Sequence, residues 1–154
     1  MDLFHQFNQI IRAFNQHNVE YVLIGGYAVI LHGLPRTTLD MDIVVKLDEA
    51  NIRKFKQALK ALYDDKDIEE ITREELGKYA VIRYGTPDNF YIDIMAGIGE
   101  VENFDTIESE VIQIEGIDIT VATPEALYRM KQNTIRPHDQ GDAHFLKELI
   151  KKNK

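Results

Sequence analysis

The chain has 154 residues, a formal net charge of −8, no cysteine and 44% hydrophobic residues, a composition typical of one folded globular domain over residues 1–154. The acidic charge argues against broad, nonspecific nucleic-acid binding, and the lack of cysteine excludes a disulfide framework and a zinc–thiolate site. No apolar run approaches the roughly 20 residues that span a bilayer, and the start is unlike a signal peptide, so we expect a cytoplasmic protein with no membrane partner.

The first elements along the chain are predicted to be a helix, a strand and a short second helix. Apolar residues recur at helical spacing over residues 3–16, which indicates an amphipathic helix. Residues 21–24 (YVLI) predict a short buried strand. Gly25 and Gly26 interrupt it, and residues 27–32 can restart as a helix.

A loop, a strand and a helix are expected next. The segment LPRTT contains Pro35, which disfavours a regular element, and residues 39–46 then predict a second strand. Asp48 is suited to cap a helix that ends near residue 63. The acidic stretch 64–75 is interpreted as a solvated helical face.

The rest of the chain predicts two hairpins followed by two helices. The turn residues TPDN join the first pair of strands, and Glu115-Gly116 joins the second pair. The strands are expected at 79–84, 90–95, 110–114 and 117–121, and the helices begin at Thr123-Pro124-Glu125 and after Pro137. The predicted class is α/β (α+β), a mixed β-sheet with helices packed on it.

Three aspartates lie on predicted strands that are otherwise apolar. Asp40 and Asp42 share one face because strand side chains alternate, and their backbones lie roughly 6–7 Å apart. Asp93, in the segment YIDIM, offers a third carboxylate. Gathered carboxylates raise one another's pKa unless a divalent cation neutralises them, and hard oxygen donors suit Mg²⁺ or Mn²⁺. The alternative is that each acid is an exposed residue on a half-solvated strand.

The Gly25-Gly26 pair stands where a strand is expected to end and a helix to begin. Such a point presents free backbone N–H groups, and glycine lets the backbone approach a phosphate closely. A glycine pair alone most often marks an ordinary turn. Followed by Asp-x-Asp on the next strand, it predicts a polyphosphate site with metal ions.

These residues resemble the nucleotidyltransferase superfamily that includes DNA polymerase β. The pattern is Gly25-Gly26, Asp40-x-Asp42 and a separated Asp93. The segment KQNTIRPHDQGDAHFL resembles one seen in many small bacterial and archaeal members, including those in toxin–antitoxin loci. The resemblance implies a polymerase β-like nucleotidyltransferase fold for the single domain.

The resemblance also implies roles for particular residues. Asp40, Asp42 and Asp93 match the catalytic, metal-binding acids, and Gly25 and Gly26 match the pair that holds the phosphates. Arg36, in the loop before the acids, is a candidate triphosphate contact, and Lys131 is a candidate nucleotide contact in the C-terminal segment. The superfamily usually has a serine at or just after the second glycine position, and here Gly26 and Tyr27 stand there.

The C-terminal segment has a structural interpretation as well. Asp139 or Asp142 can pair with Arg136 or Lys131 and bridge two helices without touching a substrate. His32 and His138, which are isolated histidines, are expected to be structural.

The reaction implied by the resemblance is transfer of a nucleoside monophosphate, AMP above all, from ATP or another nucleoside triphosphate to a hydroxyl. Two ions, Mg²⁺ or Mn²⁺, would serve as cofactors, and the acceptor is a protein, an RNA or a small molecule. One alternative is a non-catalytic nucleotide-binding regulator or antitoxin-like subunit that acts through a helical partner protein. Another is a resistance enzyme that adenylylates an aminoglycoside, although such enzymes generally carry an extra helical domain.

Overall fold

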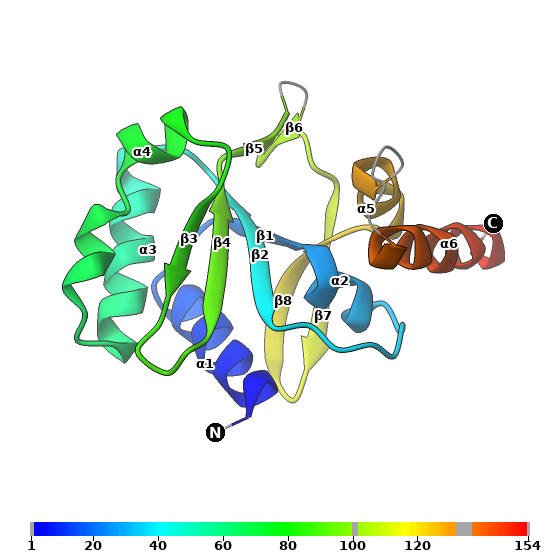
Figure 1. Ribbon diagram of the computed structural model, residues 1–154, viewed down its shortest axis with the longest axis horizontal. Coiled ribbons are helices and arrows are strands. Elements are labelled where there is room, and N and C mark those ends of the chain that lie inside the picture. Colours follow the sequence, from blue (N-terminus) through cyan, green and yellow to red (C-terminus); the bar gives the residue numbers. More distant parts are fainter. Residues whose placement is uncertain (1, 100–101, 132–136, 154) are drawn as a thin grey trace.

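A six-stranded mixed sheet forms the centre of the protein (Figure 1). The computed structural model describes residues 2–99, 102–131 and 137–153, and within these the side chains of residues 131 and 137–140 are not described. The strand order is β3-β4-β2-β1-β8-β7. Strand pairs β2–β4 and β1–β8 are parallel, and the other neighbours are antiparallel. The strands are β1 (Tyr21–Ile24), β2 (Asp40–Val45), β3 (Ile82–Gly85), β4 (Tyr91–Met95), β7 (Ser109–Ile114) and β8 (Ile117–Ala122).

Two long helices, α1 (Leu3–Gln16) and α3 (Glu49–Leu62), cover one face of this sheet. The ring of Phe14 on α1 lies 5.1 Å from that of Phe55 on α3 and 5.5 Å from that of Tyr21 on β1. Tyr21 pairs with Val45, so the face under the helices carries the odd-numbered residues of β2. These odd-numbered residues of β2 are fully buried. The even-numbered residues therefore face the opposite side, away from α1 and α3.

The helix starts follow the capping residues in the sequence. Asp2 accepts a hydrogen bond from the backbone of His5 at 2.7 Å at the start of α1, and Asp48 accepts one from Asn51 at 2.7 Å at the start of α3, where the sequence predicted a cap. Thr123 accepts one from Ala126 at the start of α5 (Pro124–Lys131).

Three regions differ from the sequence predictions by more than one residue. The acidic stretch forms two short helices, η1 (Lys66–Glu70) and α4 (Arg73–Lys78). The next strand begins at Ile82 rather than at residue 79, because Tyr79 ends α4 and its N–H donates to the carbonyl of Glu75. Helix α2 (Gly25–Leu31) begins at Gly25 itself, two residues before the expected start.

The C-terminal helices lie at one end of the sheet. Helix α6 (Pro137–Lys152) packs against α5 and extends away from the body of the protein (Figure 1). A second, two-stranded sheet joins β5 (Gly97–Ile98) to β6 (Glu102–Asn103). No helix within the described residues is long and apolar enough to cross a membrane.

Candidate active site

The three aspartates lie on neighbouring strands and on the same face of the sheet. Asp42 on β2 pairs in register with Asp93 on parallel β4, and Asp40 pairs with Tyr91. In-register partners on adjacent strands point to the same side, so all three carboxylates face away from α1 and α3. The Asp40 side chain is one-third exposed, and that of Asp93 is 14% exposed. The pairing of β2 with β4 thus brings together residues separated by about a third of the chain.

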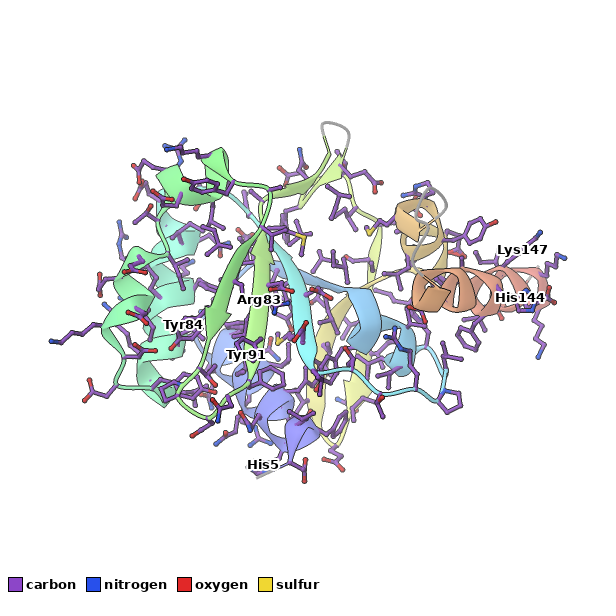
Figure 2. All side chains as sticks on the ribbon, in the orientation of Figure 1. His5, Arg83, Tyr84, Tyr91, His144 and Lys147 are labelled. Atoms are coloured by element: carbon purple, nitrogen blue, oxygen red, sulfur yellow. The ribbon has the colours of Figure 1, made fainter. Side chains whose placement is uncertain are left out.

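Arg83 on β3 joins two of these acids and was not singled out from the sequence (Figure 2). Its Nε donates to Asp93 Oδ1 at 2.8 Å, and its Nη2 donates to Asp93 Oδ2 at 3.0 Å and to Asp40 Oδ2 at 2.9 Å. The hydrogen bond and charge of Asp93, followed by the charge of Asp40, raise the pKa of the Arg83 guanidinium above its usual range. The sequence did carry one signal for Arg83, which is the only charged residue in the predicted strand 79–84.

An exposed aromatic ring lies beside the acids. The Arg83 guanidinium is 5.3 Å from the ring centre of Tyr91, and that side of the site is open enough to leave Tyr91 39% exposed (Figure 2). A Cβ on Gly85 would lie 2.9 Å from Cε1 of Tyr91, so the absence of a side chain at Gly85 lets the ring lie against the β3 backbone. Tyr91 and Arg83 form the β3 side of the site.

Gly25 makes room for the Asp42 carboxylate. Its φ is +71°, and a Cβ built on it would lie 2.1 Å from Asp42 Oδ2. Ile24, the residue before it, pairs with Asp42 in the β1–β2 ladder, which brings the first turn of α2 against that carboxylate. Glycine is therefore required here both by the backbone conformation and by the position of an acid that the sequence analysis assigned to the site.

Gly26 similarly makes room for two side chains of the loop that precedes β2. A Cβ at this position would lie 2.9 Å from the Thr38 hydroxyl and 3.2 Å from Nη1 of Arg36. The Thr38 hydroxyl thus lies beside Gly26. Arg36 Nη1 also donates to Oδ2 of Asp142 on α6 at 2.7 Å.

The site residues of the C-terminal segment are only partly described. The Lys131 side chain, Arg136 and the Asp139 side chain lie outside the described residues. Asp142 is described and pairs with Arg36, a partner that the sequence analysis did not consider. Of the two histidines, His32 has its Nε2 2.9 Å from the carbonyl oxygen of Ala122, which fits the expected structural role, and the His138 side chain is not described.

The donor set suits a hard divalent cation, but its present arrangement is that of an ion-pair cluster. Within the described residues, no group of three or more histidine, cysteine, aspartate or glutamate side chains is arranged to hold a metal ion. In the structure, Arg83 binds oxygens of both Asp40 and Asp93. Three carboxylates on one face fit Mg²⁺ or Mn²⁺ chemically, and a bound ion would compete with the guanidinium for these oxygens.

Comparison with known proteins identifies the fold. No protein-family model and no curated protein matches the sequence. Among solved structures, an antigenic nucleotidyltransferase-like protein from Paracoccidioides brasiliensis is 16% identical with a TM-score of 0.63, and the match covers 96% of this chain and 76% of that one. The lincosamide antibiotic adenylyltransferase LnuA, solved with lincomycin bound, is 18% identical with a TM-score of 0.60, covering 90% of this chain and 92% of that one.

A protein from Thermotoga maritima described as a nucleotidyltransferase gives a third match. It is 14% identical with a TM-score of 0.56, and the match covers 97% of this chain and 92% of that one. At these identities the likeness establishes the fold alone. The mixed sheet and its helices have the polymerase β-like nucleotidyltransferase fold, which confirms the predicted fold class.

Proposed function

We propose that this protein is a metal-dependent nucleotidyltransferase, which moves a nucleoside monophosphate from a nucleoside triphosphate to a hydroxyl and releases pyrophosphate. The observation that carries the proposal is the gathering of Asp40, Asp42 and Asp93 on one face, with Asp42 held against Gly25. The nucleotidyltransferase fold supports this reaction class, and ATP, which would donate AMP, is the first nucleotide to test.

The three acids would act by binding and orientation. Asp40 and Asp42 would hold two Mg²⁺ or Mn²⁺ ions, one of them shared with Asp93, and bound ions supply charge neutralisation for the triphosphate and a lower pKa for the acceptor hydroxyl. In the transfer, the acceptor oxygen bonds to the α-phosphorus, the bond to the β-phosphate oxygen breaks, and the acceptor proton passes toward Asp93 or solvent. The protein's contribution is then chiefly positioning.

The strand order supports separate binding positions for the triphosphate and for the acceptor, on opposite sides of Asp42. Asp42 lies between β1, which leads into the Gly25-Gly26 start of α2, and β4, which carries Asp93. We assign the triphosphate to the α2 side, where Gly26 and Arg36 lie. Because the attacking and leaving oxygens are in line across the α-phosphorus, the acceptor would approach from the β3–β4 side.

A small molecule is the acceptor class that the comparisons favour. LnuA is by its name an adenylyltransferase of lincosamide antibiotics, and the match spans 92% of its chain. The match covers 90% of this chain as well, which supports a small-molecule acceptor as the first class to test. Proteins and RNA remain alternative acceptors, and the experiment below supplies them alongside small molecules.

The test is transfer of label from ATP carrying a radioactive α-phosphate, with Mg²⁺ and the small-molecule, RNA and protein fractions of a cell lysate supplied separately. We expect pyrophosphate release together with label in one fraction. Asp42→Asn should abolish both and leave the far-ultraviolet circular dichroism spectrum unchanged. Asp118→Asn, the same change at an exposed strand residue of β8, is the matched control and should remain active.

Two results would contradict the proposal. Transfer by Asp42→Asn at the wild-type rate with saturating Mg²⁺ would remove Asp42 from the chemistry. Nucleotide binding without pyrophosphate release in any fraction would favour the non-catalytic regulator, for which a helical protein partner is the first candidate to seek.

A further inference from the structure

We infer that Asp142 of α6 is a positioning residue for the nucleotide, because it holds the Arg36 guanidinium on the triphosphate side of the site. The inference rests on the proposed function and adds to it Asp142 of the C-terminal helix, which was expected from the sequence only to bridge two helices. Arg36 would touch the phosphates, and Asp142 would act through Arg36.

The burial of Asp142 makes the ion pair a strong constraint. Its side chain is 2% exposed, against 22% for Arg36, and the Arg36 Nη1 to Asp142 Oδ2 distance is 2.7 Å. Within the described residues, Asp142 is the one buried residue that carries a formal charge, since the other buried polar residues are Gln6, Asn51 and Thr86. A buried carboxylate is costly unless a cation and hydrogen bonds satisfy it, so Arg36 is strongly held.

The same Arg36 nitrogen lies against the start of α2. Nη1 is 3.2 Å from the place where a Cβ on Gly26 would stand, so the guanidinium is held beside a glycine backbone rather than extended into solvent. Guanidinium has five N–H donors in a fixed plane, and the hydrogen bond to Asp142 comes from one nitrogen. Its partial exposure leaves the outer edge available to phosphate oxygens, which guanidinium groups bind well.

A purely structural role for the pair, as the anchor of α6, is less well supported by the packing. Helix α6 already packs along α5, and its Leu146 is fully buried. Phe145 reaches the loop after α2, where a Cβ on Gly33 would lie 3.7 Å from its ring. These apolar contacts attach α6 to the body, so the isosteric change Asp142→Asn should leave α6 in place.

Loss of the carboxylate should free the Arg36 side chain and weaken nucleotide binding. Immobilising a flexible side chain on binding costs enough to reduce affinity about 3- to 10-fold, and Asp142 removes this cost in advance. We expect Asp142→Asn to raise the dissociation constant for ATP by this factor. The KM for ATP should rise similarly, with little change in kcat.

The experiment measures binding of α,β-methylene-ATP with Mg²⁺ by calorimetry, which needs no turnover. The variants are Asp142→Asn, Arg36→Ala and the double variant, with thermal unfolding recorded for each. Glu148→Gln, at an exposed α6 residue that pairs with Lys151, is the control and should bind like wild type. Because Asp142 acts through Arg36, the double variant should bind no more weakly than Arg36→Ala alone.

The outcomes separate this inference from the proposed function. If the wild-type protein binds no nucleoside triphosphate, the proposed function and this inference both fail. If it binds and Asp142→Asn matches Glu148→Gln, or if the losses from Asp142→Asn and Arg36→Ala multiply, only the positioning role is overturned. Should Asp142→Asn not fold, Asp142→Glu keeps the charge and moves the carboxylate by one methylene, and unchanged affinity in that variant would also overturn the role.

Discussion

Gly25→Ala is the sharpest test of how the backbone supports the acids. Alanine would have to adopt φ +71°, a left-handed conformation that costs roughly 1–2 kcal/mol for a residue with a Cβ. For a chain of this size, a loss of 1–2 kcal/mol lowers the melting temperature by about 2–8 °C. The new methyl carbon would also stand 2.1 Å from Asp42 Oδ2, so the carboxylate must move.

The displacement of Asp42 should appear as a loss of divalent-cation binding. Disturbing a group that orients a metal ligand typically reduces metal affinity about 10- to 100-fold, and we expect a loss of this size for Mn²⁺. Mn²⁺ binding is measured by electron paramagnetic resonance, and the melting temperature by calorimetry.

Gly116→Ala separates the two effects. Gly116 has φ +79°, and nothing lies within 4 Å of a Cβ built on it, so alanine there brings the same backbone strain without a clash. Both variants should lose similar stability, and only Gly25→Ala should lose Mn²⁺ binding. Equal Mn²⁺ affinity in the two variants would refute the reasoning that Gly25 exists to make room for Asp42.

Three further changes test the ion pairs, the buried polar contacts and the pH dependence. Arg83→Met frees the oxygens of Asp40 and Asp93 and should tighten Mn²⁺ binding about 3- to 10-fold by calorimetry, whereas weaker binding would mean that Arg83 orients these acids for the metal. Asn51→Ala removes three part-buried hydrogen bonds to the backbone around β1 and β2 and should lower the free energy of unfolding in urea by about 2–3 kcal/mol, and a loss below 1 kcal/mol would contradict this reading. Burial raises the pKa of Tyr27 to about 12, so its unfolded form loses the proton first and stability should fall as pH rises from 10 to 12. Tyr27→Phe should reduce that fall in urea titrations at each pH but not abolish it, because burial also raises the pKa of Tyr21, Tyr63 and Tyr84, and an unchanged slope would assign the fall to other groups.

The local elements were predictable because each depends on neighbours in sequence. The alternation of side chains in β2 placed Asp40 and Asp42 on one face, and the helix caps at Asp48 and Thr123 were visible as single residues. The glycine pair was also visible, although its packing reason, room for Asp42, was not. Strand β3 begins later than predicted because Tyr79 is the residue that ends the preceding helix, α4.

What the sequence by itself determined, then, is the order of most helices and of the six strands of the main sheet, and the side of each strand on which its acids lie, because these follow from the short periods of the backbone. Only the tertiary structure decided which strands are neighbours, and hence that Asp93 stands beside Asp42 and that Arg83 bridges Asp93 to Asp40. The pairing of Arg36 with Asp142 joins residues 106 positions apart. No local pattern specifies such a contact, since it depends on how the complete fold brings the loop before β2 to α6.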